Sequence, residues 1–390
     1  MKVLMINVVC GIRSTGRICT DLATALTVQG HEVKIAYGRG NVPEQFQKYA
    51  VRIGSDIDVK LHGIKARLLD EAGFGSRAAT IKFIKWVKKY DPDVIHLHNI
   101  HGYYINVEAL FDYLKTCGKK IIWTLHDCWS FTGHCVYFDY VGCEKWKTGC
   151  GHCPQKLEYP SRIGPDMSKG HYILKKNLFT GVKDMTLVTP SQWLADLISE
   201  SYMKEYTTRV IYNGVDTEIF KSIENNVKEQ YNCQDKKIIL GVAAVWDKRK
   251  GLSSFIELAD RLDESYQIIL VGLSKKQIEK LPSNIIGIER TNGVQELVTL
   301  YSAATVFVNP TLEDNYPTTN IESIACGTPV ITYETGGSPE SAALFGDSVP
   351  KNNIEKLVYA IKNIDQVKHS AIDVDYKNTV QKYIELYRGI

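Results

Sequence analysis

The sequence predicts a doubly wound α/β protein built from two domains. Its 390 residues exceed what one domain usually contains. Short, continuously apolar runs recur between helical stretches, which is typical of parallel strands that are buried on both faces. Glycines, histidines and carboxylates gather in the loops directly after these runs, where parallel sheets bind their ligands. We therefore expect two sheets that face each other across a central cleft.

Eleven runs are predicted to be strands. In the first half they are Lys2–Val9, Glu32–Tyr37, Asp93–Leu97, Lys120–Leu125, Thr186–Thr189 and Arg209–Tyr212. In the second half they are Lys236–Val242, Gln267–Val271, Ile285–Ile288, Thr305–Asn309 and Pro329–Tyr333. The turn-rich stretch Tyr212–Asp216 marks the join, so the domains are expected at residues 1–210 and 211–372.

Composition and charge limit the class of protein. With 44% hydrophobic and 23% charged residues, the chain is globular rather than disordered. No apolar run approaches the roughly 20 residues of a membrane span, and the first ten residues are interpreted as a buried strand rather than a signal peptide. A cytoplasmic protein with reduced or metal-bound cysteines is expected.

The two halves differ in charge. Residues 1–210 contain 28 Lys and Arg against 20 Asp and Glu, whereas residues 211–390 contain 19 against 24. A basic half suits an anionic partner such as a phospholipid surface, a nucleic acid or a phosphorylated substrate, and a solvated surface with chance bias is the alternative.

The strongest local signal runs from Pro310 to Glu322. An apolar strand ends at Asn309, a loop with two carboxylates follows, and a helix is expected to start near Thr318. Free amides at a helix start bind anions, and carboxylates accept hydrogen bonds from hydroxyl groups. The segment therefore suits a ligand that carries phosphates and sugar hydroxyls. Alternatively, Thr318 only caps the helix and the acids are solvated.

The same residues resemble a known family. Asp314 and Glu322 are separated by seven residues and Cys326-Gly327-Thr328-Pro329-Val330 follows, which is similar to the E-x7-E and A-C-G-T-P-V-I block of the retaining glycosyltransferases of family four. Four further motifs occur in the family's order: Gly30-His31-Glu32-Val33, Pro190-Ser191, Asn213-Gly214-Val215-Asp216 with Phe220, and Thr335–Glu340. The resemblance implies the GT-B fold, with a closing helix, residues 373–390, that packs on the first domain. The residues of these motifs resemble those of bacterial members that assemble capsule, exopolysaccharide or O-antigen.

The resemblance implies a nucleotide-sugar donor, UDP-sugar first and GDP-sugar second, bound by the second domain. Glu322 would bond the donor ribose, Asp314 or Glu313 the sugar, and the amides of Asn315 and Tyr316 the sugar or diphosphate. Lys250 would neutralise the departing diphosphate, although Lys248–Lys250 also reads as an exposed basic turn. The family's usual Arg is missing at Ala243–Val245, so Arg249 is the candidate replacement. Arg290 is a further candidate for the base or phosphate.

The first domain is expected to hold the acceptor. Its loop Gly11–Arg17 is not a G-x-G-x-x-G motif, which disfavours a nicotinamide cofactor. The resemblance implies that Gly16 closes over the donor phosphates, with Arg13 or Arg17 as a further cation. It also implies that His126 lies beside the anomeric carbon. Asp127, His98 and His101 are expected on the acceptor side, and metal binding by these histidines is disfavoured.

A cysteine cluster stands apart from these motifs. Cys135, Cys143, Cys150 and Cys153 follow one another in a segment too short for its own core, and a C-x-x-C pair ends the series. Four thiols suit one structural zinc ion, and a redox pair or inert thiols are the alternatives. No cofactor is expected for catalysis, because no D-x-D motif follows a strand in the expected context.

The stretch Ile81–Tyr90 is predicted to form a basic amphipathic helix. It would either pack on a sheet with its lysines reaching solvent or lie on an anionic membrane. The membrane reading fits a polyprenyl-diphosphate-linked acceptor, and no nucleic-acid partner is expected.

We therefore expect a retaining glycosyltransferase of cell-surface polysaccharide biosynthesis. Two alternatives stay open. One is an enzyme resembling UDP-N-acetylglucosamine 2-epimerase on the same fold. The other is a non-catalytic binding module ordered by zinc.

Overall fold

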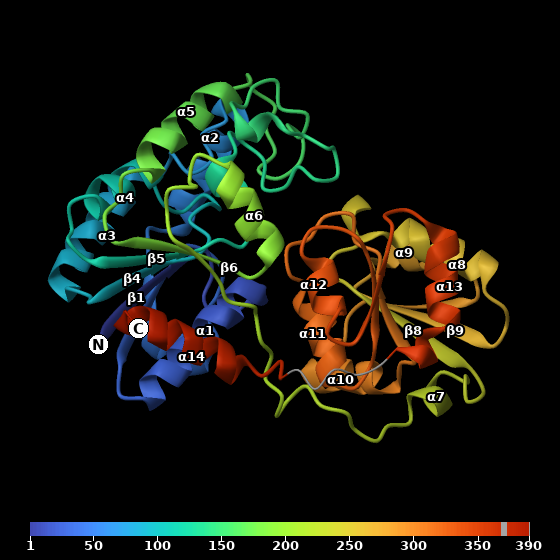
Figure 1. The fold of residues 1–390 in the computed structure, drawn as a ribbon. Helices are drawn as coiled ribbons and strands as arrows, with labels where there is room; N and C mark the ends of the chain where they lie inside the picture. The colour runs from blue at the N-terminus through green and yellow to red at the C-terminus, as the bar shows by residue number, and fades with distance from the viewer. Residues whose placement is uncertain (368–372, 390) are drawn as a thin grey trace. The chain divides into compact units, whose positions relative to one another are not determined.

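A computed structural model describes residues 1–367 and 373–389. The chain divides into two compact units, Met1–Tyr212 with Val380–Ile390, and Asn213–Thr379 (Figure 1). Each unit contains one parallel sheet with helices on both faces, so the predicted doubly wound α/β class is confirmed. The domain boundary expected at residue 372 lies outside the described residues.

The first unit contains a seven-stranded sheet in the order β3-β2-β1-β4-β5-β6-β7. Its strands are β1 (Lys2–Asn7), β2 (Glu32–Tyr37), β3 (Ala50–Arg52), β4 (Val94–Leu97), β5 (Lys120–Thr124), β6 (Met185–Thr189) and β7 (Thr208–Val210). Its helices are α1 (Arg13–Val28), α2 (Asp56–Leu69), α3 (Arg77–Tyr90), α4 (Val107–Leu114), α5 (Ser168–Phe179) and α6 (Gln192–Glu200). The last helix, α14 (Tyr376–Arg388), ends in this unit.

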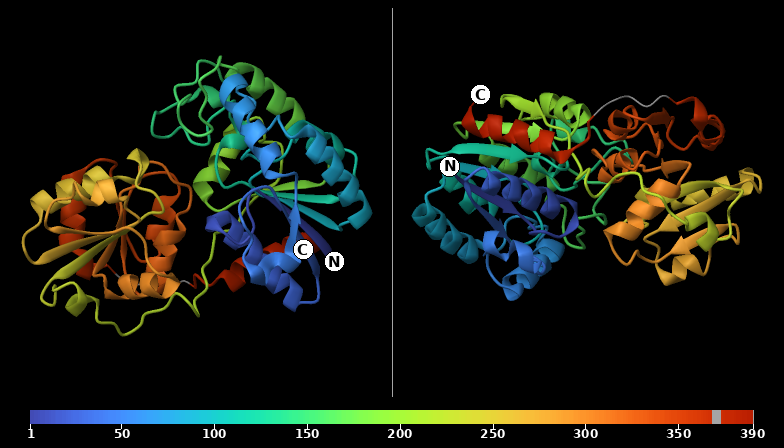
Figure 2. Two further views of the ribbon diagram at one scale, coloured as in Figure 1. Left: turned by 180° about the vertical axis from the view of Figure 1, so that it is seen from behind. Right: turned by 90° about the horizontal axis from the view of Figure 1, so that it is seen from below.

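Two helix layers cover this sheet. One face packs against α3, α4, α5 and α6 through a core that includes Leu97, Trp123 and Phe179. Helices α1 and α14 lie on the other side of the strands (Figure 2). There, the Tyr387 hydroxyl is 2.7 Å from His96 Nδ1 and the Tyr383 hydroxyl is 2.9 Å from Thr124 Oγ1. Side chains from the far end of the sequence thus complete the first sheet's cover.

The second unit contains a six-stranded sheet in the order β10-β9-β8-β11-β12-β13. Its strands are β8 (Lys237–Val242), β9 (Tyr266–Val271), β10 (Ile285–Ile288), β11 (Val306–Asn309), β12 (Val330–Tyr333) and β13 (Gly346–Val349). Its helices are α7 (Val227–Gln230), α8 (Leu252–Arg261), α9 (Lys275–Ile278), α10 (Val294–Ala303), α11 (Thr318–Ala325), α12 (Ser338–Ala342) and α13 (Ile354–Lys362). One core lies under α8 and α13 and another under α10 and α11.

The eleven predicted strands are present, with end points shifted by up to two residues, and two strands are additional. Both additional strands, β3 and β13, are at sheet edges. They are short and only partly buried, so they lack the continuous apolar run that identifies a central parallel strand.

Each sheet has one point where the strand order reverses direction. In the first unit it lies between β1 and β4, and in the second unit between β8 and β11. Loops diverge to opposite faces at such a point and leave a crevice beyond the carboxyl ends of the strands. The loops after these four strands are therefore where ligand-binding side chains are expected.

Helix α3 contains the predicted amphipathic stretch and packs on the sheet through Phe83 and Val87. Its lysines are exposed, as the sheet-packing interpretation expects, and contact of these lysines with a membrane stays a prediction. Exposed apolar side chains instead line α2: Ile57, Leu61, Ile64 and Leu68. Within residues 1–367 and 373–389, no helix is both long and apolar enough to cross a membrane.

Candidate functional site

A lysine–carboxylate pair occupies the point of reversal in the second sheet. Lys250 follows β8, Asp314 follows β11, and Lys250 Nζ lies 2.6 Å from Asp314 Oδ2. The two side chains are 25% and 18% exposed, so the pair is sheltered but open to a ligand. The structure thus brings together two residues that the sequence proposed separately, one for the diphosphate and one for the sugar.

Close backbone packing fixes this pair. Gly251 has a positive φ of 73°, and a Cβ at this position would lie 2.1 Å from the carbonyl oxygen of Pro310. Leu312 N–H donates to the Arg249 carbonyl oxygen at 2.7 Å. The loops after β8 and β11 therefore interlock, and only glycine permits their approach.

The neighbouring candidates Arg249 and Glu313 are placed differently from the pair. The Arg249 guanidinium lies 3.2 Å from the Asp247 carboxylate, on its own loop. Glu313 is only 3% exposed. Asp314 is thus the more accessible of the two acidic candidates, and Arg249 is held beside the site by a partner two residues away.

Helix α11 starts at the end of the same loop. Its N-cap is Pro317, whose side chain makes no capping hydrogen bond. The alternative that Thr318 only caps the helix is therefore wrong, since Thr318 is the first helical residue. Glu322, one turn into the helix, is 4% exposed and accepts a hydrogen bond from the Tyr301 hydroxyl at 3.2 Å.

Asn315 and Tyr316 complete the loop before α11. The Asn315 amide donates to Asp314 Oδ1 at 3.0 Å. The Tyr316 side chain is 6% exposed and packs in the core under α10 and α11. The side chain of Tyr316 therefore anchors the loop.

A buried amide network that the sequence analysis missed holds α11 in place. Asn320 Oδ1 accepts from Asn309 Nδ2 at 2.8 Å. Asn320 Nδ2 donates to the hydroxyls of Ser338 and Ser341 at 3.2 and 2.9 Å. These bonds join the end of β11 to α11 and α12, and fix the loop that contains Asp314. Asn309, the polar residue that ends the apolar strand Val306–Asn309, was the available signal.

Arg290 is exposed in the loop that follows β10, the edge strand of the sheet. Strands β9 and β8 separate it in the sheet order from the point of reversal. Its assignment to the donor remains a prediction.

The expected glycine loop of the first unit is shorter than predicted. Helix α1 begins at Arg13, so Gly16 and Arg17 lie inside the helix. Gly11 N–H donates to the Gly16 carbonyl oxygen at 3.2 Å, and Gly16 is buried. The prediction that Gly16 belongs to a loop is therefore wrong, because the helix starts directly after the turn at Gly11.

Two hydrogen-bonded pairs line a hollow beyond β4 and β5. His98 Nδ1 lies 3.0 Å from His126 Nε2. His101 Nε2 lies 2.8 Å from Asp127 Oδ2. All four residues line one pocket together with Trp123 and Trp129. The structure therefore brings together the three residues that the sequence assigned to the acceptor side and His126, which it placed beside the anomeric carbon.

Burial sets the protonation of this cluster. It lowers the pKa of His126 to about 4 and the pKa of His98 well below its usual value. Burial favours the neutral acid of Asp127, but His101 beside it outweighs this effect and lowers the Asp127 pKa. At neutral pH the cluster thus contains a neutral His126 and an ionised Asp127, which suits hydrogen bonding to hydroxyl groups.

The four cysteines line a second pocket in the same unit, with His134 and Trp146. All are free thiols. The expectation that this segment lacks a core is wrong in part, since Phe138 stacks on Trp146 with ring centroids 4.9 Å apart. Across the described ranges, no three His, Cys, Asp or Glu side chains are already grouped to hold a metal ion.

Comparison with known proteins identifies the family. Residues 15–219 match the model of Glycosyltransferase Family 4, and residues 236–366 match the model of Glycosyl transferases group 1. The first match covers more than half of the chain. The chain therefore belongs to glycosyltransferase family 4 and is a glycosyltransferase.

Individual relatives agree with this membership. WcaC of Escherichia coli K12, named as a colanic acid biosynthesis glycosyl transferase, is 26% identical over 93% of this chain and 90% of its own length. RfbU of Salmonella typhimurium LT2, an O-antigen chain mannosyltransferase, is 28% identical over 77% of this chain and 89% of its own length.

Solved structures confirm the GT-B fold. Sucrose-phosphate synthase of Thermosynechococcus elongatus superposes with a TM-score of 0.70 at 17% identity, over 100% of this chain and 98% of that one. Anabaena HepE in complex with UDP superposes with a TM-score of 0.67 at 14% identity, over the whole of both chains.

Proposed function

We propose that this glycosyltransferase moves a sugar from a UDP-sugar to a saccharide acceptor, with retention of the anomeric configuration, in the assembly of a cell-surface polysaccharide. The observation that carries the proposal is the Lys250–Asp314 pair at the point of strand reversal. The relatives that act in colanic acid and O-antigen synthesis support the polysaccharide. HepE, solved with UDP, supports the nucleotide.

Lys250 and Asp314 have separate roles in this proposal. The Lys250 ammonium neutralises the charge that develops on the departing diphosphate, which lowers the barrier to bond cleavage. Asp314 holds the lysine in place and accepts a hydrogen bond from a sugar hydroxyl. Glu322, at the buried side of α11, binds the ribose. Arg249 adds a second positive charge, and the amides of Asn315 and Tyr316 bind the sugar or diphosphate.

Transfer proceeds on one face of the sugar. The acceptor oxygen attacks the anomeric carbon from the side on which the diphosphate leaves, and the bond from that carbon to the phosphate oxygen breaks. The acceptor proton passes to the departing phosphate oxygen. The enzyme contributes positioning and charge stabilisation. His126, neutral at pH 7, binds a sugar hydroxyl, while His98, His101 and Asp127 orient the acceptor.

We further propose that the enzyme is cytoplasmic, binds the membrane surface and acts on a lipid-linked acceptor. The exposed apolar residues of α2 are interspersed with the exposed bases Lys60, Lys65 and Arg67. Such a pattern suits the headgroup region of an anionic bilayer. Replacement of Ile57, Leu61 and Ile64 by Ser is expected to reduce sedimentation with anionic vesicles at low salt, and unchanged binding would contradict this part.

A donor screen tests the reaction. Thermal-shift measurements with UDP-, GDP- and ADP-sugars are expected to show the largest stabilisation for one UDP-sugar. Release of UDP and the product's mass then measure transfer to a saccharide acceptor, and the proton coupling at the new linkage reports its configuration. Epimerised donor formed without acceptor would instead indicate a 2-epimerase. Binding without transfer or hydrolysis would indicate a non-catalytic module.

A further inference from the structure

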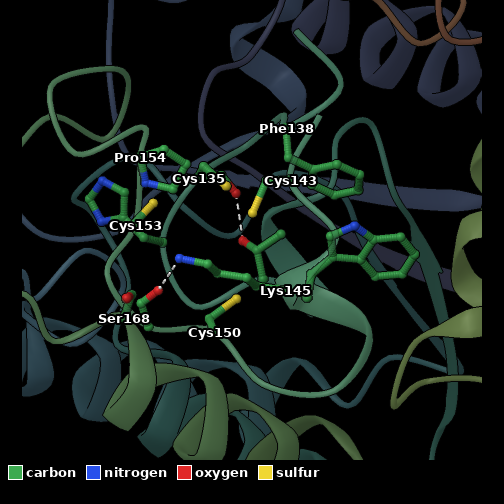
Figure 3. A pocket seen from close by; sticks show the side chains of 12 residues that line it. Cys135, Phe138, Cys143, Lys145, Cys150, Cys153, Pro154 and Ser168 are labelled. Carbon is green, nitrogen blue, oxygen red and sulfur yellow. Dashed lines mark hydrogen bonds between the residues drawn. The ribbon is translucent and has the colours of Figure 1, made fainter. Parts of the chain in front are cut away.

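The cysteine pocket lies outside both candidate substrate sites and has no role in the proposed reaction. It is lined by His134, Cys135, Cys143, Cys150 and Cys153, with Phe138 and Trp146 alongside (Figure 3). These residues belong to the segment between β5 and α5, which contains little regular structure. Four cysteine sulfurs and one histidine ring, all potential metal ligands from one irregular segment, thus surround one small pocket.

Local hydrogen bonds already hold this segment in a compact arrangement. Lys145 Nζ donates to the carbonyl oxygens of Gly151 and His152 at 3.0 and 3.1 Å. Gly133 N–H donates to Cys150 Sγ at 3.2 Å. The thiols of Cys135 and Cys153 are hydrogen-bonded to each other.

His134 supplies an independent indication of a ligand. It is 3% exposed, and its Nδ1 lies 2.7 Å from Asp70 Oδ1. Its Nε2, on the ring that lines the pocket, is buried and has no hydrogen-bond partner among the residues that the structure describes. Leaving a buried polar atom unpaired costs about 1–3 kcal/mol. A carboxylate on the other ring nitrogen is the arrangement that orients histidines at metal centres.

A buried cation beside the pocket points the same way. Lys175 is 1% exposed, and its ammonium donates to the carbonyl oxygens of Trp129 and Thr132 at 2.9 and 3.1 Å. Burial lowers the pKa of Lys175 to about 7, whereas the electrostatic effect of Cys150 and Cys135 raises it. A zinc ion held by four thiolates carries a net negative charge, and a buried charge of opposite sign offsets it.

We propose that this pocket binds one structural zinc ion through Cys135, Cys143, Cys150 and Cys153, with His134 facing the metal–thiolate centre. A zinc-bound sulfur facing His134 Nε2 would supply the partner that this buried nitrogen lacks. Four sulfur ligands favour zinc over harder divalent ions. Because no three donors are yet grouped at ligand distance within the described residues, binding must draw the cysteine side chains together, and so it orders the segment.

Metal content tests the proposal without reference to activity. The full chain, purified without chelator and after growth with zinc, is expected to contain about one zinc ion per chain by elemental analysis. The double variant Cys143→Ser, Cys150→Ser is expected to lose nearly all of it. The matched control Cys117→Ser alters a thiol outside the pocket that donates to the Leu114 carbonyl oxygen, and it is expected to retain the zinc.

A second measurement keeps the proposal testable if the double variant fails to fold. Cobalt added to the metal-free wild-type chain is expected to give the near-ultraviolet thiolate charge-transfer absorption of a sulfur-ligated ion. Wild-type protein that neither contains zinc nor takes up cobalt overturns the proposal. Full zinc retention in a folded double variant overturns it as well. A Cys135–Cys153 disulfide in freshly isolated metal-free protein would replace it with a redox pair.

Discussion

At the scale of single residues, the proposed reaction depends most on the positive charge of Lys250. Replacement by Ala removes the cation proposed to face the departing diphosphate, and Asp314 loses its ion-pair partner. By comparison with other preorganised charge-stabilising groups, kcat should fall by about 10²–10³. Steady-state release of UDP measures the effect.

The control for this change is Lys248→Ala, which removes an exposed charge from the same turn. It should leave kcat within about twofold, because solvent screens an exposed charge. Equal losses in both variants would mean that the turn contributes only a general positive field, and full activity in Lys250→Ala would refute the assigned role.

The environment of His62 leads to a separate prediction, which concerns the stability of the folded protein in acid. Burial lowers its pKa to about 4, and its Nε2 accepts the N–H groups of Gly73 and Gly75 at 3.2 and 3.1 Å. Since the unfolded chain binds this proton near pH 6.5, stability is complete above pH 6.5 and falls as the pH drops towards 4. The loss from this group should be on the order of 3 kcal/mol.

Urea unfolding between pH 4 and 7 measures the slope. His62→Gln cannot take up the proton and should unfold with a weaker dependence on pH in this range, even though it is less stable at pH 7. An unchanged slope would show that other groups, such as the buried His96, dominate acid unfolding.

At the scale of elements, Asn320 decides how α11 is held against β11 and α12. Asn320→Ala removes the partner of the buried Asn309 Nδ2 and one partner from each of the Ser338 and Ser341 hydroxyls. An unpaired buried polar group costs about 1–3 kcal/mol. The midpoint of thermal unfolding should therefore fall. KM for the donor should also rise, since the loop with Asp314 loses its anchor.

The two readouts separate positioning from mere stability. Asn363→Ala removes an amide on an exposed helix end and serves as the control, since it should change neither quantity appreciably. A lower unfolding midpoint with unchanged KM would show that the amide network stabilises the unit without positioning the loop.

The sequence predicted those elements whose defining residues lie close together along the chain, and it missed features that depend on residues far apart in sequence. Continuous apolar runs located the central strands, and the rule that ligands bind beyond parallel strands located the loops with Lys250 and Asp314. The pairing of these two residues spans 64 positions and needed the strand order. Likewise, β13 is partly polar, and the start of α1 at Arg13 depends on the turn at Gly11 rather than on periodicity.

At the scale of the whole molecule, the two ends of the chain meet in one unit. Tyr387→Phe removes the hydroxyl next to His96 Nδ1, on a residue 291 positions away in sequence. The buried imidazole is then left with one partner fewer, and the first unit should lose about 1–3 kcal/mol of stability. Tyr359→Phe, at a side chain that is 71% exposed, is the matched control.

Chemical unfolding, followed by a probe in each unit, checks this. Only the first unit's transition should shift in Tyr387→Phe. A shift confined to the second unit would contradict the packing of α14, and no shift in either would show that the hydroxyl is dispensable.

The docking of α14 has a consequence for biosynthesis. While the ribosome is still making residues 213–379, the early sheet exists without its last covering helix, and Thr124 and His96 await Tyr383 and Tyr387. A nascent chain stalled before Val380 should therefore expose this sheet face to proteases and chaperones. Full protection would come only when the final turns of α14 emerge.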